Sequence, residues 1–91
     1  MENFDIKNFD EFFEAILKLK DKEDCRKFFE DVCTIKELQD VSQRLEVASL
    51  LNQGKNYQEI SKATGASTAT ISRVNKCLLY GKNGYQIVLK K

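Results

Sequence analysis

Apolar residues recur at intervals of three and four along most of the chain, a spacing that predicts consecutive amphipathic α-helices. The first two helices are expected over about residues 8–19 and 22–33. Their apolar stripes are rich in phenylalanine, which is typical of a core or a dimer interface. The stripes consist of Phe9, Phe12, Phe13, Ile16 and Leu17, followed by Cys25, Phe28, Phe29 and Val32.

The third and longest helix is expected over about residues 35–53. Thr34 and Glu37 have the spacing of a capping box at its start, and Gly54 is expected to end it. A helix that is apolar over so wide an arc should be covered on more than one side, so it would form the spine of the domain. Its apolar positions are Ile35, Leu38, Val41, Leu45 and Ala48 along one face, with Val47, Leu50 and Leu51 beside it.

A helix-turn-helix is predicted over about residues 56–80. Asn56 is a favoured N-cap for a short first helix, and Gly65 can adopt the left-handed backbone of a tight turn. Ser67 would cap the second helix, which is expected over residues 68–80. Helix pairs with a glycine turn also occur as plain structural elements, so this pattern alone leaves DNA binding open.

Apolar positions on both helices of this motif are expected to face inward and to close the angle between them. Ile60 and Ala63 would do so from the first helix, Ala66 from the turn, and Ile71, Val74 and Leu78 from the second helix.

The outer face of the second helix carries small side chains near its start. Small side chains let a helix approach base edges in the DNA major groove, where hydroxyls can bond to several bases and a methyl group can contact thymine. Arg73 could read guanine or hold a phosphate; the alternative is an ion pair with an acidic residue of the N-terminal half. Thr68, Ala69, Ser72, Arg73 and Lys76 form this face, and Lys55 and Lys62 are further candidates for phosphate contact.

The net charge of +1 conceals an asymmetry between the two halves. Residues 1–40 carry 12 acidic and 7 basic side chains, whereas residues 41–91 carry 2 acidic and 8 basic ones. The basic half indicates an anionic partner such as double-stranded DNA. A solvated charged face, attracted to the acidic half of the same or another subunit, is the alternative.

Composition narrows the class of protein further. The 91 residues suggest a single domain over residues 1–91, and they contain no apolar run long enough to cross a membrane. The acidic, mixed N-terminus differs from a signal peptide, so a cytoplasmic location is expected. Three cysteines without a CxxC pair and the absence of histidine argue against a disulfide framework, a metal site and an enzyme.

The segment GASTATISRVNKCL, residues 65–78, resembles the recognition segment of the Trp repressor superfamily. Residues 43–81 are more similar still to the YerC/YecD-type Trp-repressor-like proteins. The resemblance implies an all-α, Trp-repressor-like domain that forms an intertwined homodimer and regulates transcription by binding operator DNA. The DNA-facing positions that it implies are Gln58, Ser61, Thr68, Ala69, Thr70, Ser72 and Arg73; Lys76 is added from the helix face described above.

The corepressor pocket of the tryptophan-responsive members transfers poorly to this chain. Their recognition-helix arginine is followed by glycine, and it sandwiches the bound indole with an arginine of the long helix. Arg73 matches the first arginine, but Val74 replaces the glycine, and the second arginine aligns with Gln43 rather than with the adjacent Arg44. A shift of one residue rotates a side chain by about 100° on a helix. Arg44 and Arg73 are therefore the candidate effector residues, and weak or absent tryptophan binding is predicted, with no cofactor.

The C-terminal tail is expected to form a short extended arm. Asn83 and Gly84 make a turn dipeptide, and Tyr85, Ile87 and Leu89 alternate as in a strand. Two alternatives are a frayed terminus and a basic arm that touches DNA through Lys82, Lys90 and Lys91.

Two functions remain in competition. The first is a sequence-specific, homodimeric DNA-binding regulator, and the second is a protein–protein interaction module without DNA binding. An interaction module should expose large apolar residues on the second motif helix, whereas Thr68, Ala69, Ser72 and Lys76 are small or polar.

Overall fold

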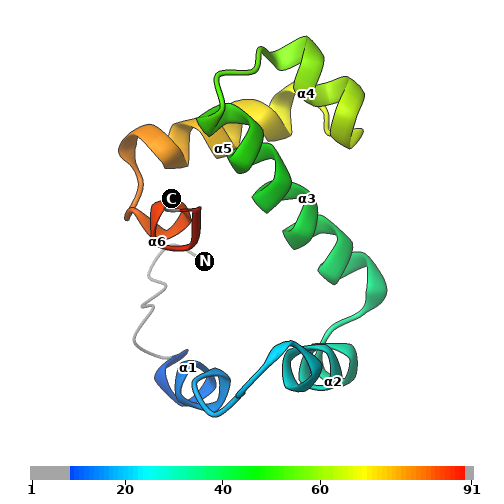
Figure 1. Cartoon of the computed structure of the whole chain (residues 1–91), viewed down its shortest axis with the longest axis vertical. Helices are drawn as coiled ribbons and strands as arrows, with labels where there is room; N and C mark the ends of the chain where they lie inside the picture. The colour runs from blue at the N-terminus through cyan, green and yellow to red at the C-terminus, as the bar shows by residue number, and fades with distance from the viewer. Residues whose placement is uncertain (1–8, 90–91) are drawn as a thin grey trace. The chain divides into compact units, whose positions relative to one another are not determined.

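The computed structural model of the chain describes residues 9–89, which form six α-helices and no strand. The expected all-α fold is confirmed. Two compact units make up the chain, and the boundary between them falls after Ile35. The helices are α1 (Asp10–Ile16), α2 (Lys22–Val32), α3 (Ile35–Asn52), α4 (Tyr57–Thr64), α5 (Thr68–Tyr80) and α6 (Gly84–Leu89), as Figure 1 shows along the chain.

The N-terminal unit contains α1 and α2. Asp21 begins α2 as its N-cap, because its carboxylate accepts a hydrogen bond from the backbone amide of Asp24 at 2.9 Å. The rings of Phe12 and Phe28 join the two helices, with their centroids 6.2 Å apart. Helix α1 is shorter than predicted: it ends at Ile16, and the predicted start at residue 8 lies outside the described residues.

The apolar stripe of this unit is left open. None of the described residues of α1 and α2 is buried, and Phe12 and Phe13 keep 39% and 41% of their surface exposed. Leu17 and Val32 are exposed as well. The described residues of the unit therefore form an aromatic cluster without a closed core.

Helix α3 is the longest, as predicted, and it carries two different surfaces. Val47 and Ala48 near its C-terminal end are fully buried, whereas Val41 and Leu45 are exposed. Gly54 follows the helix with a φ of +85°, the left-handed conformation expected of a glycine that ends a helix. Within its own unit, α3 is fully covered only at Val47 and Ala48.

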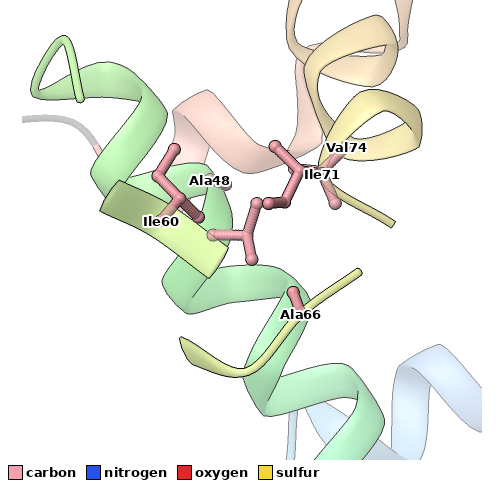
Figure 2. Packing of buried hydrophobic residues seen from close by; sticks show 6 residues of the cluster. Ala48, Ile60, Ala66, Ile71 and Val74 are labelled. Atoms are coloured by element: carbon pink, nitrogen blue, oxygen red, sulfur yellow. The ribbon is translucent and has the colours of Figure 1, made fainter. Parts of the chain in front are cut away.

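The core of the C-terminal unit forms where α3, α4 and α5 meet, as the close view in Figure 2 shows. Leu50 and Leu51 of α3 and Leu78 of α5 pack around it. The buried residues are Val47, Ala48, Ile60, Ala66, Ile71 and Val74.

The inward position expected for Ala63 is wrong. Ala63 is exposed, while Tyr57, Ser61 and Thr64 are half-buried and Ile60 is buried. The covered face of α4 is therefore centred between Ile60 and Thr64, and Ala63 lies to its side because successive helix positions are 100° apart. Thr64 is half-buried although it is polar, because its hydroxyl bonds to the carbonyl of Ile60 and to the amide of Ala66. The spacing of apolar residues does not predict these polar contacts.

The extended C-terminal arm is also wrong, because residues 84–89 form helix α6. Asn83 does adopt a turn conformation, with φ +69°, but the turn leads into a helix. Tyr85 and Leu89 pack against the core, whereas Ile87 is exposed. Tyr85 and Leu89, which attach this segment to the core, are thus one helical turn apart and not at alternate positions as in a strand. Of the basic residues in the alternative DNA-touching arm, Lys90 and Lys91 lie outside the described residues.

Candidate nucleic-acid interface

Helix α4 begins at a complete capping box. The amide of Glu59 donates to Oδ1 of Asn56 at 2.8 Å, and the amide of Asn56 donates to Oε1 of Glu59 at 2.9 Å. These two bonds satisfy donors that a helix start otherwise leaves without partners. The N-cap expected at Asn56 is confirmed, and the orientation of the short helix is fixed from its first turn.

The turn between α4 and α5 is held by side chains as well as by backbone. Gly65 has a φ of +77°, and its amide donates to the carbonyl of Ser61 at 2.8 Å. The hydroxyl of Thr64 accepts a bond from the amide of Ala66 at 3.1 Å. The hydroxyl of Ser61 donates to the carbonyl of Ala66 at 2.9 Å. Since Ala66 is itself buried, the turn is fixed both by polar contacts and by packing.

Helix α5 begins at Ser67, whose hydroxyl oxygen accepts a bond from the amide of Thr70 at 3.1 Å. The predicted N-cap is confirmed. Ile71 and Val74 retain 0% and 1% of their surface exposure, so the apolar side of the helix faces the core. Its opposite side is therefore the one presented to solvent.

The predicted DNA-facing residues of α4 and α5 fall into two groups by their exposure. The exposed group consists of Gln58, Thr68, Ala69, Ser72, Arg73 and Lys76. The second group, Ser61 and Thr70, is half-buried, and the hydroxyls of both residues take part in hydrogen bonds within the motif. Ser61 thus helps to stabilise the turn, and Thr70 contacts the N-cap residue of α5.

A surface hollow of about 370 Å³ joins the start of α5 to the face of α4. It brings together Gln58, Ser61 and Thr68, three of the predicted positions, with Lys62 beside them. Tyr57 lines the same hollow, although no prediction singled it out. Its position four residues before Ser61 is the signal that could have found it, since residues i and i+4 share a helix face.

The positive side chains of this surface are free of carboxylate partners within their own unit. Over residues 36–89, the structure gives Arg73, Lys62 and Lys76 no ion pair, and the surface pair there joins Lys36 to Asp40 at 3.2 Å. The alternative role of Arg73, an ion pair with the N-terminal half, stays untested.

The two candidate effector residues do not line one cavity. Arg44 lines an open apolar hollow of about 460 Å³ with residues of α5 and α6, among them Cys77 and Tyr85, whereas Arg73 is exposed and is not part of that lining. Val74, which replaces the family's glycine, lies in the core.

The described part of the chain offers neither a membrane-spanning helix nor a metal cluster. None of its helices is long and apolar enough to cross a membrane. Within residues 9–89 there is also no cluster of three or more histidine, cysteine or acidic side chains suited to a metal ion.

Comparison with known sequences identifies the family of this chain. The sequence matches the Trp repressor protein family over residues 7–91, which is nearly the whole chain. The chain belongs to the Trp repressor family. The uncharacterized protein YerC of Bacillus subtilis (strain 168) is 53% identical over 85 residues, which cover 93% of this chain and 82% of YerC.

Solved structures of the family agree with this fold. A TrpR-like protein from Eubacterium eligens superimposes with a TM-score of 0.88 at 51% identity, over 92% of this chain and 87% of that one. A candidate Trp repressor from Staphylococcus aureus superimposes with a TM-score of 0.87 at 48% identity, over 91% of this chain and 83% of that one. The Trp-repressor-like fold expected from the recognition segment is therefore confirmed.

Proposed function

We propose that the protein is a sequence-specific transcriptional regulator that binds DNA as a homodimer through α4 and α5. The observation that carries the proposal is the pair of opposite faces on α5. Ile71 and Val74 anchor one face in the core, and the small residues Thr68, Ala69 and Ser72 leave the other open. Membership of the Trp repressor family supports the same function.

The open face suits the major groove of B-DNA. A helix can enter that groove when its leading side chains are small, because bulky ones would hold the backbone away from the base edges. Thr68 and Ser72 can donate or accept hydrogen bonds, and the methyl group of Ala69 can contact thymine. Arg73 follows one position later with a guanidinium suited to the two acceptors of guanine.

Phosphate contacts would come from the rest of the motif. Lys62 and Lys76 flank the open face, and Gln58 and Ser61 lie across the hollow from Thr68. Residues 41–91 carry six more basic than acidic side chains, which favours approach to a polyanion. Contacts to phosphate fix register without reading sequence, so affinity should fall steeply as salt rises.

The proposed homodimer accounts for the apolar surface that one chain leaves open. The stripe around Phe12 and Phe13 needs an apolar cover, and Val41 and Leu45 offer exposed apolar surface on α3. The opposite charges of the two halves favour contact between the acidic part of one copy and the basic part of another. Intertwining of two copies would bury both surfaces at once and set two recognition helices about 34 Å apart, one turn of DNA.

An interaction module without DNA binding is the second candidate, and one observation favours it. Leu79 and Tyr80 are 63% and 81% exposed, so α5 does present large apolar side chains. They lie at the C-terminal end of the helix, about three turns from Thr68. Their location suits self-association or a protein partner without occupying the face proposed for DNA.

Tryptophan is not part of the proposed function. Titration calorimetry with tryptophan should give weak or no binding, since Val74 fills the core beside Arg73 and the hollow lined by Arg44 does not include Arg73. Micromolar affinity would contradict this prediction.

Selection from a random pool of double-stranded DNA tests the proposed function directly. The purified protein should enrich a roughly palindromic motif whose half-sites are one helical turn apart. A pool that stays flat after repeated rounds would contradict sequence-specific binding and favour the interaction module.

A further inference from the structure

A side chain of the spine reaches the helix-turn-helix through a directional bond. Nε2 of Gln43, on α3, donates to the backbone carbonyl of Thr64 at 3.1 Å, across 21 positions of sequence. Both residues are half-buried, so water competes less for this bond than for one at the surface. Thr64 is the last residue of α4, where carbonyls lack partners within the helix.

The accepting carbonyl belongs to a piece that is already rigid. The hydroxyl of Thr64 donates to the carbonyl of Ile60 at 2.8 Å and accepts from the amide of Ala66, while Ser61 holds the carbonyl of Ala66. The end of α4, the turn and the start of α5 should therefore move together. A bond from Gln43 to Thr64 fixes the whole piece relative to the spine.

The apolar contacts between the spine and this piece constrain it differently. Val47 and Ala48 pack against Ile60 and Ile71 in the core, but apolar contact has no preferred direction. Apolar packing therefore resists separation of α3 from the helix-turn-helix more than it resists small rotations between them. A hydrogen bond depends steeply on distance and angle, so Gln43 adds the constraint on orientation that packing lacks.

We infer that Gln43 is a positioning residue for DNA recognition, a role that rests on the proposed function. Gln43 lies on α3, outside the face of α4 and α5 that is proposed to contact DNA. It would therefore affect DNA binding only through Thr64. Its bond sets the orientation of α5 on the spine and thereby the spacing of the two recognition helices in the dimer. It should matter for binding to a correctly spaced palindrome and hardly at all for binding to DNA of any sequence.

The test compares Gln43→Met with Gln39→Met in the full-length protein. Methionine keeps the length and the helix propensity of glutamine but cannot donate a hydrogen bond. Gln39 is exposed one turn earlier on α3, so its substitution controls for the same change elsewhere on the helix. Affinity is measured for the selected palindrome, for variants of it with one base pair added or removed between half-sites, and for unrelated DNA, each at several salt concentrations.

Gln43→Met should lower affinity for the selected palindrome by about fivefold to tenfold, the value of one hydrogen bond. It should also weaken the preference for one half-site spacing. Affinity for unrelated DNA should change less than about twofold, and the salt slope should stay the same, because no phosphate contact is lost. Gln39→Met should behave as the unchanged protein does.

Two outcomes would overturn the positioning role, and a third would overturn the proposed function. Equal specific affinity and equal spacing preference for Gln43→Met and the unchanged protein would overturn the positioning role. So would a parallel loss of specific and non-specific binding with a lower melting temperature, since that pattern indicates general destabilisation. If the unchanged protein selects no sequence at all, the proposed function fails, and the role of Gln43 fails with it.

Discussion

The two units of the chain bury their apolar residues to very different extents. In the C-terminal unit, α3, α4 and α5 enclose six buried residues, and α6 adds Tyr85 and Leu89 at the edge. In the N-terminal unit, α1 and α2 bring their phenylalanine rings together, yet no described residue of either helix is buried. The first arrangement can hold a recognition helix in place. The second leaves apolar side chains exposed, which the proposed homodimer would cover.

The charges of the two regions differ in the same way as their burial. Residues 1–35 carry four more acidic than basic side chains, and residues 36–91 carry five more basic than acidic ones. The region with the closed core is thus also the region suited to a polyanion. The region with the open stripe would repel DNA and would be drawn to a basic protein surface. Burial and charge therefore both support the proposed function, in which the C-terminal unit binds DNA and the N-terminal unit contacts a second copy.

The closed core gives the largest expected effect. Ile71→Ala should lower the free energy of unfolding by about 2–5 kcal/mol, because it removes buried methyl groups and leaves a cavity. Ile87→Ala is the matched control: Ile87 is 72% exposed on α6, so its substitution should cost less than about 1 kcal/mol. Urea unfolding followed by circular dichroism measures both variants. Equal losses would show that the core is not where the structure places it.

The open stripe should matter mainly for assembly. Phe13→Ala should weaken the dimer by about 1–3 kcal/mol if the ring is buried against a second copy. Glu14→Ala, next to it on the exposed side of α1, should change dimerisation much less. Sedimentation equilibrium over a range of concentrations measures the dissociation constants. A dimer insensitive to Phe13→Ala would place the interface elsewhere.

Arginines in the two units should affect DNA binding unequally. Arg73→Ala should cost on the order of 1–3 kcal/mol on the selected sequence if its guanidinium makes a two-point contact with guanine. Arg26 lies on α2 and pairs with Glu23 at 2.7 Å, so Arg26→Ala should leave affinity within about twofold. A gel-shift titration of both variants measures the contrast, and equal binding by Arg73→Ala and the unchanged protein would remove Arg73 from the reading face.

The cap of the recognition helix gives the smallest effect. Ser67→Ala should cost about 1 kcal/mol of stability, because the amide of Thr70 loses its acceptor. Ser72→Ala, on the exposed face of the same helix, should be close to neutral or slightly stabilising, since alanine is the better helix former. Thermal unfolding of the two serine variants measures the difference. A cost as large for Ser72→Ala as for Ser67→Ala would contradict the cap.

Local chemistry made the helix-turn-helix readable from the sequence. Asn56, Gly65 and Ser67 each act on residues no more than four positions away, and all three do what their types predict. Ile60, Ile71 and Val74 were readable as core for a similar reason, since their spacing follows the helical period.

Non-local packing explains what the sequence did not reveal. Tyr85 and Leu89 alternate with Ile87 as strand residues would, but a spacing of four also fits one face of a helix. The choice depends on the core to which Tyr85 and Leu89 attach, and residues 83–89 alone do not contain that information. The bond from Gln43 to Thr64 spans 21 positions and follows no period, so only the fold brings its two atoms together.

Hydroxyl-radical footprinting on the selected DNA tests the central claim most directly, that α5 of two copies enters neighbouring major grooves. Protection should appear in two windows on one face of the duplex, with centres about 10–10.5 base pairs apart. Arg73→Ala should weaken both windows equally, because each copy supplies one arginine. A single window, or uniform protection that follows no sequence, would contradict the account.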